Sequence, residues 1–476
     1  MNLTWLVVLE VLYVVPLATW IVLEKRHPLA TIAWILSLAL LPVAGFPIYY
    51  LLGPRRLRRK KSRRALALNR IGASLPDLRA LTDPSLGIVH EKLDVRRRQL
   101  IGLALNNSQA PLSTGNQARL LRNGSACYEA IERALQEARH HVHFQSYIFE
   151  PDQVGSRFRD LLVERAKAGV EVRLLVDAVG SAALAPRFLQ PLQRAGAELG
   201  VFNRVSFARF RPANFRNHRK IVVVDGEVGF TGGLNVGDEY LGRARAAGAW
   251  RDTHLELRGP AVRGLQRIFV EDWNFATGHT VTAPAYFPER TGEGGELVQI
   301  VGSGPDRDWQ AIQQLFFAAI ASAQERVLLT TAYFVPDEPT LCALVTAALR
   351  GVDVQLLLPR HTDSLTARAA GRSYFDELLR AGVRLFEYLP GMLHAKTLVV
   401  DRAFCAVGSA NFDQRSFRLN FEVSALIYGE TVADQLATVF DQDLTVSREI
   451  TPEEREARGF GQRLTEAAAR VFSPLL

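Results

Sequence analysis

The fold is decided by the stretch Asn217-His218-Arg219-Lys220-Ile221-Val222-Val223-Val224-Asp225, which is followed after six residues by Gly232-Gly233-Leu234-Asn235. A second copy reads Leu393-His394-Ala395-Lys396-Thr397-Leu398-Val399-Val400-Asp401 and, after six residues, Gly408-Ser409-Ala410-Asn411. Both copies follow the pattern HxKxxxxDxxxxxxG(G/S)xN without a gap. One copy could arise by chance, but two copies with every spacing held indicate an internal duplication.

The spacing within each copy places two polar side chains on one face of a strand. The β-branched run that follows Lys220 favours a β-strand. Residues two positions apart on a strand share a face, so His218 and Lys220 project together, as do His394 and Lys396. Each copy therefore offers one imidazole and one ammonium group side by side.

The rest of each copy supplies a turn and an amide. An aspartate ends the strand and turns the chain, and Gly232 or Gly408 lets the backbone approach a ligand closely. The asparagine that follows can donate an amide hydrogen bond to that ligand. The candidate catalytic residues are His218, Lys220, Asp225, His394, Lys396 and Asp401, and the candidate phosphate-binding residues are Asn235, Asn411, Lys220 and Lys396.

Two such sets, brought together at a pseudo-two-fold axis, suit a phosphodiester. Two ammonium groups and two amides stabilise the charge that grows as a nucleophile adds to phosphorus, and they do so without a metal or cofactor. One histidine attacks phosphorus and the other protonates the leaving alkoxide. Imidazole suits both tasks because its ordinary pKa is about 6.5. The spacing does not say which histidine attacks.

The sequence around the two motifs is also repeated. Apolar strands ending at Pro151 and Pro336 alternate with helical stretches in both copies, which indicates α/β layers. The glycines that open the next strand in each copy, Gly169 and Gly351, recur at a similar offset. We expect two α/β domains, at 116–295 and at 296–476 with a C-terminal helix, after a juxtamembrane segment and connector at 55–115.

Two apolar stretches open the chain, Leu3 to Leu23 and Leu29 to Leu52. Each is close to the roughly 20 residues that a helix needs to cross a bilayer. They predict a transmembrane helical hairpin at 1–54. A pair of buried helices in a soluble domain is the alternative, and Pro42 and Pro47 leave a re-entrant second segment open.

The excess of positive charge is local. The chain has 57 Lys and Arg against 49 Asp and Glu, a net charge of +8, and the run from Arg55 to Arg64 supplies eight of the positive charges without an acid. By the positive-inside rule this run places both termini and all that follows it in the cytoplasm, and it should bind an anionic membrane surface. The remainder is formally neutral, which argues against a nucleic-acid partner.

These features together resemble the phospholipase D superfamily and, within it, the bacterial cardiolipin synthases. The resemblance rests on the paired motifs, the N-terminal hairpin with its basic run, and the flanking segments 232–240, 250–254 and 415–422. It implies two tandem α/β/α sandwich domains of phospholipase D type related by pseudo-two-fold symmetry. It also implies a multi-pass enzyme of the bacterial cytoplasmic membrane, with its catalytic domains facing the cytoplasm.

The resemblance implies the reaction 2 phosphatidylglycerol → cardiolipin + glycerol, through a phosphatidyl-histidine and without a metal. In that pattern His218 is the nucleophile, and His394 is the general acid that later serves as base. Asp252 and Glu422, each downstream of the histidine of its own half, are candidates to accept the second N–H of an imidazole. Ordinary salt-bridged carboxylates are an equal alternative for both.

Other functions stay open on the sequence. The same groups would serve a lipid hydrolase that releases phosphatidic acid, or a transferase with another alcohol acceptor. A nuclease is less well supported because the basic residues are not dispersed, and a non-catalytic scaffold for anionic lipid would be expected to lose a histidine or lysine. The sequence does not define the oligomeric state.

Overall fold

The computed structural model describes residues 3–23, 28–41, 93–203, 215–243, 248, 250–289 and 292–476. The chain forms two compact units, Met1–Ala65 and Leu66–Leu476. The basic run from Arg55 to Arg64, with its predicted membrane contact, lies outside the described residues.

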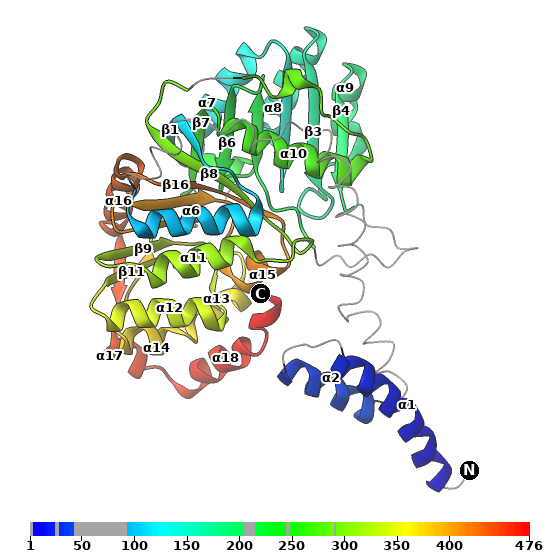
Figure 1. Ribbon diagram of the computed structural model, residues 1–476, viewed down its shortest axis with the longest axis vertical. Coiled ribbons are helices and arrows are strands. Elements are labelled where there is room, and N and C mark those ends of the chain that lie inside the picture. The colour runs from blue at the N-terminus through cyan, green and yellow to red at the C-terminus, as the bar shows by residue number, and fades with distance from the viewer. Residues whose placement is uncertain are drawn as a thin grey trace. The chain divides into compact units, whose positions relative to one another are not determined.

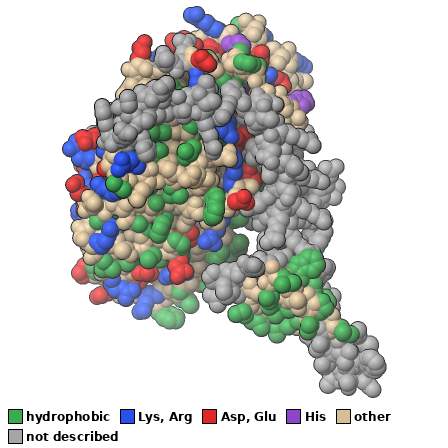
Figure 2. Space-filling model, viewed as in Figure 1, with side chains coloured by type: hydrophobic (Ala, Val, Ile, Leu, Met, Phe, Trp, Pro, Cys, Tyr) green, Lys and Arg blue, Asp and Glu red, His purple; other side chains and the backbone are tan. Residues whose placement is uncertain are grey.

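The first unit contains the helices α1 (Leu3–Leu23) and α2 (Pro28–Leu40), which pack against each other. Ile21 and Leu38 are buried between them, while other apolar side chains of both helices face outward, as Figure 2 shows. Within the described residues, no helix is both long and apolar enough to cross a bilayer. The predicted second span continues into residues 42–52, which lie outside the described part.

The second unit is built on one mixed sheet of 15 strands. The first half of the chain contributes, in spatial order from the middle of the sheet, β1 (Ser113–Arg122), β7 (Thr253–Arg258), β6 (Val228–Gly232), β5 (Ile221–Val224), β2 (His141–Ser146), β3 (Glu171–Asp177) and β4 (Glu198–Phe202). The second half contributes β8 (Glu296–Ser303), β16 (Glu422–Ile427), β14 (Phe404–Gly408), β13 (Thr397–Val400), β9 (Arg326–Thr330), β11 (Asp353–Pro359), β12 (Arg384–Tyr388) and β17 (Ser447–Ile450).

The two halves have the same strand order on either side of the central pair β1 and β8, and β17 alone has no counterpart. The motif strands β5 and β13 occupy equivalent places: β5 lies between β6 and β2, and β13 lies between β14 and β9. The prediction of an α/β fold with two repeats is confirmed. The halves share a single sheet because β1 and β8 pair antiparallel. A short parallel pair, β10 (Phe334–Val335) and β15 (Phe412–Asp413), lies beside it.

Helices cover both faces of the sheet in the first half. On β2, Val142 and Phe144 join the apolar core under α7 (Asn123–Glu137) and α8 (Gln153–Lys167). The alternating residue His143 stacks on Phe269 of α10 (Val262–Thr277) at 4.5 Å between ring centroids. Because alternate side chains of a strand point to opposite faces, α10 covers the face opposite α7 and α8. The helix α9 (Pro186–Arg194) packs beside α8.

The second half repeats this layering. Figure 1 shows α6 (Val95–Ser108), α11 (Ala311–Ala321) and α12 (Glu338–Leu349) side by side, and their contacts agree. The helix α16 (Glu430–Leu444) packs on β9, β13 and β14, and it also reaches β1 of the first half. Shorter helices complete this half: α13 (Leu365–Arg372), α14 (Phe375–Arg380), α15 (Gln414–Arg418), α17 (Pro452–Glu456) and α18 (Phe460–Arg470).

Matching local signals start the helix α8 after β2 in the first half and the helix α12 after β9 and β10 in the second. The Asp152 carboxylate accepts a hydrogen bond from the backbone N–H of Gly155 at 2.8 Å, and that of Asp337 accepts one from Thr340 at 3.2 Å. An N-cap aspartate satisfies an N–H that the helix itself leaves unpaired. The duplicated Pro-Asp sequence thus begins a helix at the same place in both halves.

Candidate active site

Both motif histidines lie where the two halves of the second unit meet. The backbone N–H of His218 donates to the carbonyl of Phe421 at 3.0 Å, and that of His394 donates to the carbonyl of Arg251 at 2.7 Å. Each histidine therefore hydrogen-bonds through its backbone to the opposite half of the chain. The two side chains are only 8% and 5% exposed.

His218 is held by a carboxylate of the second half. Its Nδ1 lies 3.1 Å from both carboxylate oxygens of Glu422, which also accepts hydrogen bonds from the Ser409 hydroxyl and, at 3.1 Å, from the Asn420 amide. Burial raises the pKa of Glu422, but His218 and Lys220 outweigh it and hold this pKa below its usual value. The ionised carboxylate can only accept, so Nδ1 of His218 carries the proton and Nε2 is left with its lone pair.

His394 is held by a carboxylate of the first half. Its Nδ1 lies 2.7 Å from Oδ2 of Asp252 and 3.4 Å from the Tyr240 hydroxyl, and the Trp250 ring lies 5.2 Å away between centroids. Burial raises the pKa of Asp252 to about 6, although Lys396 opposes it. Asp252 therefore remains ionised at neutral pH and accepts the Nδ1–H of His394.

The carboxylates are exchanged between the halves. Asp252 follows His218 along the chain and Glu422 follows His394, yet each contacts the histidine of the other half. The reason lies in the sheet: Asp252 directly precedes β7 and Glu422 begins β16, the equivalent strands of the two halves. The order of residues along the chain gave no sign of this exchange.

The two lysines are buried beside the histidines. Nζ of Lys220 donates to the carbonyl of His218 at 2.7 Å, and Nζ of Lys396 donates to the carbonyl of His394. Burial lowers the pKa of Lys220 to about 7 and that of Lys396 to about 8, against the attraction of Glu422 and Asp252. Burial thus disfavours the charged form of both lysines, and an anion bound beside them would favour it.

The electrostatics of the two halves are coupled. Burial lowers the pKa of His218 to about 4. The pKa of His394 is also well below its usual value, because of burial first and then because of the positive charges of Lys396, Lys220 and His218. Charges of the first half therefore act on the histidine of the second. With pKa values this low, both imidazoles are neutral at pH 7.

The two asparagines differ in what their side chains do. Asn235 donates through Nδ2 to the Tyr240 hydroxyl at 3.0 Å and so supports the residue that touches His394. Asn411 is buried, and within the described residues its Oδ1 has no hydrogen-bond partner. Asn235 thus spends an amide N–H within the protein, whereas among the described residues Asn411 has an unused acceptor oxygen. No group of three or more His, Cys, Asp or Glu suited to a metal occurs among the described residues.

The motif aspartates do not lie with the histidines, which corrects their assignment as candidate catalytic residues. Asp225 and Asp401 stand at the far ends of β5 and β13, with φ of +55° and +53°. The Asp225 carboxylate accepts three backbone N–H groups, from residues 139–141, and Asp401 accepts those of residues 324–326. Through these hydrogen bonds Asp225 holds the start of β2 in place and Asp401 holds the start of β9, so we assign them a structural role.

The motif glycines make room for neighbouring strands, which corrects the expectation that they admit a ligand. A Cβ at Gly232, where φ is +156°, would lie 2.6 Å from Cα of His254, and one at Gly408 would lie 2.4 Å from the carbonyl of Val423. A Cβ at Gly233 would lie 2.1 Å from Oδ1 of Asp252. Gly233 thus leaves space for the carboxylate that holds His394.

Sequence reasoning missed two buried ion pairs that join the halves or support the site. Arg219 lies between the motif His and Lys on the opposite face of the chain, 2.7 Å from Asp272, and it donates to the carbonyl of Glu422 at 3.0 Å. Arg251 pairs with Asp443 of α16 at 2.7 Å. The available signal for Arg219 was an arginine that strand alternation places on the face opposite His218 and Lys220.

Tyr147 is a further residue of the site. Its ring centroid lies 4.9 Å from that of His218, and Nζ of Lys220 lies 5.2 Å from the ring centroid. A lysine over an aromatic face gains a favourable cation–π interaction. The sequence analysis did not single out Tyr147.

The doubled histidine–lysine motif on matching halves of one sheet defines a protein of the phospholipase D superfamily. A family model described as cardiolipin synthase, PLD-like domain, matches residues 131–273 and 316–444, and one described as a phospholipase D–nuclease N-terminal segment matches 11–54. The chain belongs to the family of cardiolipin synthases with phospholipase D-like domains.

Relatives and a solved structure agree with this family. The chain is 43% identical over 463 residues to cardiolipin synthase 2 of Bacillus cereus, covering 96% of this chain and 88% of the relative. It is 42% identical over 468 residues to the cardiolipin synthase of Geobacillus kaustophilus, covering 97% and 92%. The crystal structure of a phosphatidylserine synthase from Haemophilus influenzae has the same fold, with a TM-score of 0.62 at 13% identity over 79% of this chain and all of that one.

Proposed function

We propose that this chain transfers a phosphatidyl group from one phosphatidylglycerol molecule to another, giving cardiolipin and glycerol. The observation that carries the proposal is the exchanged pairing of His218 with Glu422 and of His394 with Asp252. It gives the junction of the halves two oriented imidazoles beside two buried lysines. Two imidazoles and two ammonium groups of this kind suit the chemistry of a phosphodiester.

In the first step, Nε2 of His218 attacks the phosphorus of phosphatidylglycerol. The bond from phosphorus to the headgroup glycerol oxygen breaks, and that oxygen takes a proton from the imidazolium form of His394. The negative phosphodiester favours this protonated form once it is bound. The product is a phosphatidyl-histidine, whose Nδ1–H is hydrogen-bonded to the ionised Glu422 carboxylate, together with free glycerol.

In the second step, a hydroxyl of another phosphatidylglycerol gives its proton to His394, which is now neutral. The hydroxyl oxygen attacks phosphorus, the N–P bond breaks, and His218 is regenerated. Lys220 and Lys396 stabilise the charge on the phosphoryl oxygens in both steps. Exchange of one phosphodiester for another needs no nucleotide. We assign attack to His218 because Glu422, with its lowered pKa, keeps the carboxylate charge that supports the cationic intermediate.

In the same proposal, the N-terminal helices α1 and α2 anchor the chain to the cytoplasmic membrane. Their outward apolar side chains support this, Leu23 and Leu40 being 74% and 76% exposed. The basic run from Arg55 to Arg64 then binds anionic headgroups and fixes the catalytic unit on the cytoplasmic side. A tethered enzyme meets lipid substrates at a raised effective concentration.

The test uses the full chain in liposomes of headgroup-labelled phosphatidylglycerol with no other alcohol. Cardiolipin with an equal amount of free glycerol is the expected product, and His218→Ala and His394→Ala each abolish it. The control is Arg194→Gln, at an exposed residue ending α9, which should leave the products unchanged. Phosphatidic acid as the sole product would identify a hydrolase, and turnover in either histidine variant would refute the shared site.

A further inference from the structure

The helix α18 is attached to the second half by the side that carries its acidic group. Figure 1 shows α18 at the outer edge of this half, next to α13. Its buried residues are Glu466 and Ala469, and Ser473 continues the same side just beyond the helix. Glu466 is paired with Arg455 of α17 at 2.9 Å and also with Arg458. The inward side of α18 is therefore ionic.

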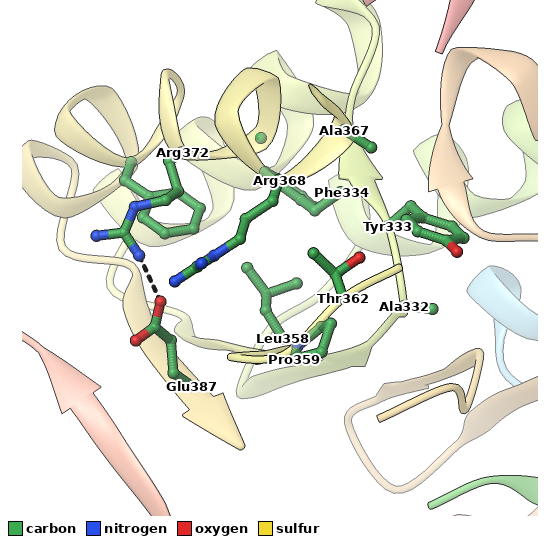
Figure 3. Close-up of a pocket in the computed structure, with 12 residues that line it drawn as sticks. Ala332, Tyr333, Phe334, Leu358, Pro359, Thr362, Ala367, Arg368, Arg372 and Glu387 are labelled. Atoms are coloured by element: carbon green, nitrogen blue, oxygen red, sulfur yellow. Dashed lines mark hydrogen bonds and ion pairs between the residues drawn. The ribbon is translucent and has the colours of Figure 1, made fainter. Parts of the chain in front are cut away.

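A network of ion pairs fixes this orientation of α18. Nε of Arg372 on α13 lies 3.4 Å from Glu466, and Figure 3 shows the same arginine reaching Glu387 of β12. Both Arg455 and Glu466 are buried, so each needs the other to offset the loss of water. Rotation of α18 about its axis would separate these charges. The network therefore keeps Glu466 inward and the opposite side of the helix outward.

The opposite side of α18 is apolar. Phe460, Leu464 and Val471 are 80%, 56% and 75% exposed, and they form what we call the outward stripe. At 3.6 residues per turn these three positions fall within about 40° of one another, along about 17 Å of helix. A surface helix ordinarily turns such a stripe toward the protein core. Here the described residues leave most of it uncovered.

The exposed charges beside the outward stripe are positive. In residues 459–476 the exposed charged side chains are Arg463 and Arg470, whereas the one acidic side chain, Glu466, is buried. The two arginines lie about two turns apart, along one edge of the stripe. Arg470 lies 4.0 Å from Glu377 of α14 and stays exposed. An apolar stripe edged by arginines is typical of a helix that lies in the surface of an anionic bilayer.

We propose that α18 lies in the headgroup region of an anionic bilayer, with the outward stripe inserted among the lipids and Arg463 and Arg470 beside lipid phosphates. This inference rests on the proposed function, in which phosphatidylglycerol supplies both the substrate and the anionic surface. It gives the catalytic unit a membrane contact of its own, in addition to the anchor that we assign to α1 and α2. The arginines gain from the negative surface potential of such a bilayer.

The segment that follows α18 connects this surface with the second motif. The backbone N–H of Arg415, in α15, donates to the carbonyl of Leu476 at 2.8 Å. In the same helix the hydroxyl of Ser416 accepts a hydrogen bond from the backbone N–H of Asn411 at 3.2 Å. One short helix therefore joins the proposed lipid contact to the motif asparagine of the second half.

The experiment places the full chain in liposomes of phosphatidylglycerol whose acyl chains carry bromine, which quenches a fluorophore only at short range. The exposed Cys342 is replaced by Ser, and one fluorophore is attached at Leu464→Cys or at Val471→Cys, the other two cysteines being buried. The fluorescence of both labels should fall about twofold or more relative to unbrominated lipid, because an interfacial helix buries its apolar face at the edge of the acyl chains. Labels at Thr465→Cys, which is exposed on α18 outside the outward stripe, and at Arg194→Cys of the first half should lose much less.

The matched control lipid is brominated phosphatidylcholine, which has no net charge. Quenching of the Leu464 and Val471 labels should be weaker there, because the two arginines gain no attraction. Equal quenching in the two lipids would refute the part that we assign to Arg463 and Arg470.

Fluorescence that is the same in brominated and unbrominated phosphatidylglycerol would overturn the inference and leave the proposed function standing. Protection of the Leu464 label from iodide in the water, without quenching by bromine, would overturn it as well, because protein would then cover the outward stripe. Quenching does not depend on turnover. Liposomes that show it but form no cardiolipin would therefore overturn the proposed function and not the depth of α18.

Discussion

His218 and Glu422 are 204 positions apart in the chain, yet the imidazole Nδ1 of one lies 3.1 Å from both carboxylate oxygens of the other. His394 and Asp252 form the matching contact at 2.7 Å across 142 positions. Neither half of the chain therefore contains a complete histidine–carboxylate pair. Changes in one half should disable the histidine of the other.

Removing the charge of Glu422 should stop the chemistry of His218. In Glu422→Gln the side-chain amide can donate to Nδ1, which would move the imidazole proton to Nε2 and remove the nucleophilic lone pair. A wrong tautomer of this kind costs about 10⁴ in turnover elsewhere, and we expect a loss of at least about 10². The rate of cardiolipin formation measures it, and Asp252→Asn should act in the same way through His394.

Ser409→Ala is the matched control for Glu422→Gln. It removes the hydroxyl that donates to Glu422 but keeps the carboxylate and its contact with His218. The rate should fall by much less than in Glu422→Gln. Equal losses in the two variants would mean that packing, and not the tautomer of His218, explains the effect.

Features that depend on residues close together in the chain can be predicted from this sequence, whereas contacts between distant residues cannot. The repeat, the α/β class and the shared face of His218 and Lys220 follow from local spacing and strand periodicity. The shared sheet does not, because periodicity marks a strand without naming its partner. The exchange of Asp252 and Glu422 between the halves depends on how the halves pair, so it could not be predicted from the sequence either. Asp225 looked catalytic because the motif groups it with His218, whereas a four-residue strand separates it from Lys220.

Asp225→Asn and Asp401→Asn should reduce stability more than chemistry. Each carboxylate accepts backbone N–H groups that would otherwise be unpaired, and loss of its charge should cost about 1–3 kcal/mol of the free energy of unfolding. Asparagine tolerates the left-handed backbone found at both positions. Thermal unfolding should shift downward, while the rate per folded molecule stays within a few-fold of the parent. A large loss of rate without a change in thermal unfolding would mean that the aspartates take part in catalysis.

Anion binding should weaken as pH rises. Burial lowers the pKa of Lys220 to about 7 and that of Lys396 to about 8, and a bound anion favours the protonated lysines. Binding above these values therefore takes up protons, so the Kd should rise about tenfold or more per pH unit beyond pH 8. Sulfate is a suitable probe because it does not titrate there, and calorimetry in two buffers measures the proton uptake. Lys396→Met should flatten the dependence, and a constant Kd from pH 7 to 9.5 would contradict it.

Gly233 allows His394 to be disabled without a change in any polar group. A Cβ at this position would lie 2.1 Å from Oδ1 of Asp252, so Gly233→Ala must displace the carboxylate that holds the Nδ1–H of His394. We expect cardiolipin formation to fall at least about tenfold, with the larger effect on the steps in which His394 moves a proton. The equivalent position of the other half is Ser409, and Ser409→Gly, which removes the hydroxyl that donates to Glu422 but leaves the carboxylate itself in place, should lower the rate less. The pH profile of the rate separates this effect from simple unfolding. An imidazole that has lost its carboxylate partner is harder to protonate, so the acidic limb of the profile should move to lower pH. Normal turnover in Gly233→Ala would mean that the Asp252 contact does not orient His394, and the exchanged pairing would then be structural only.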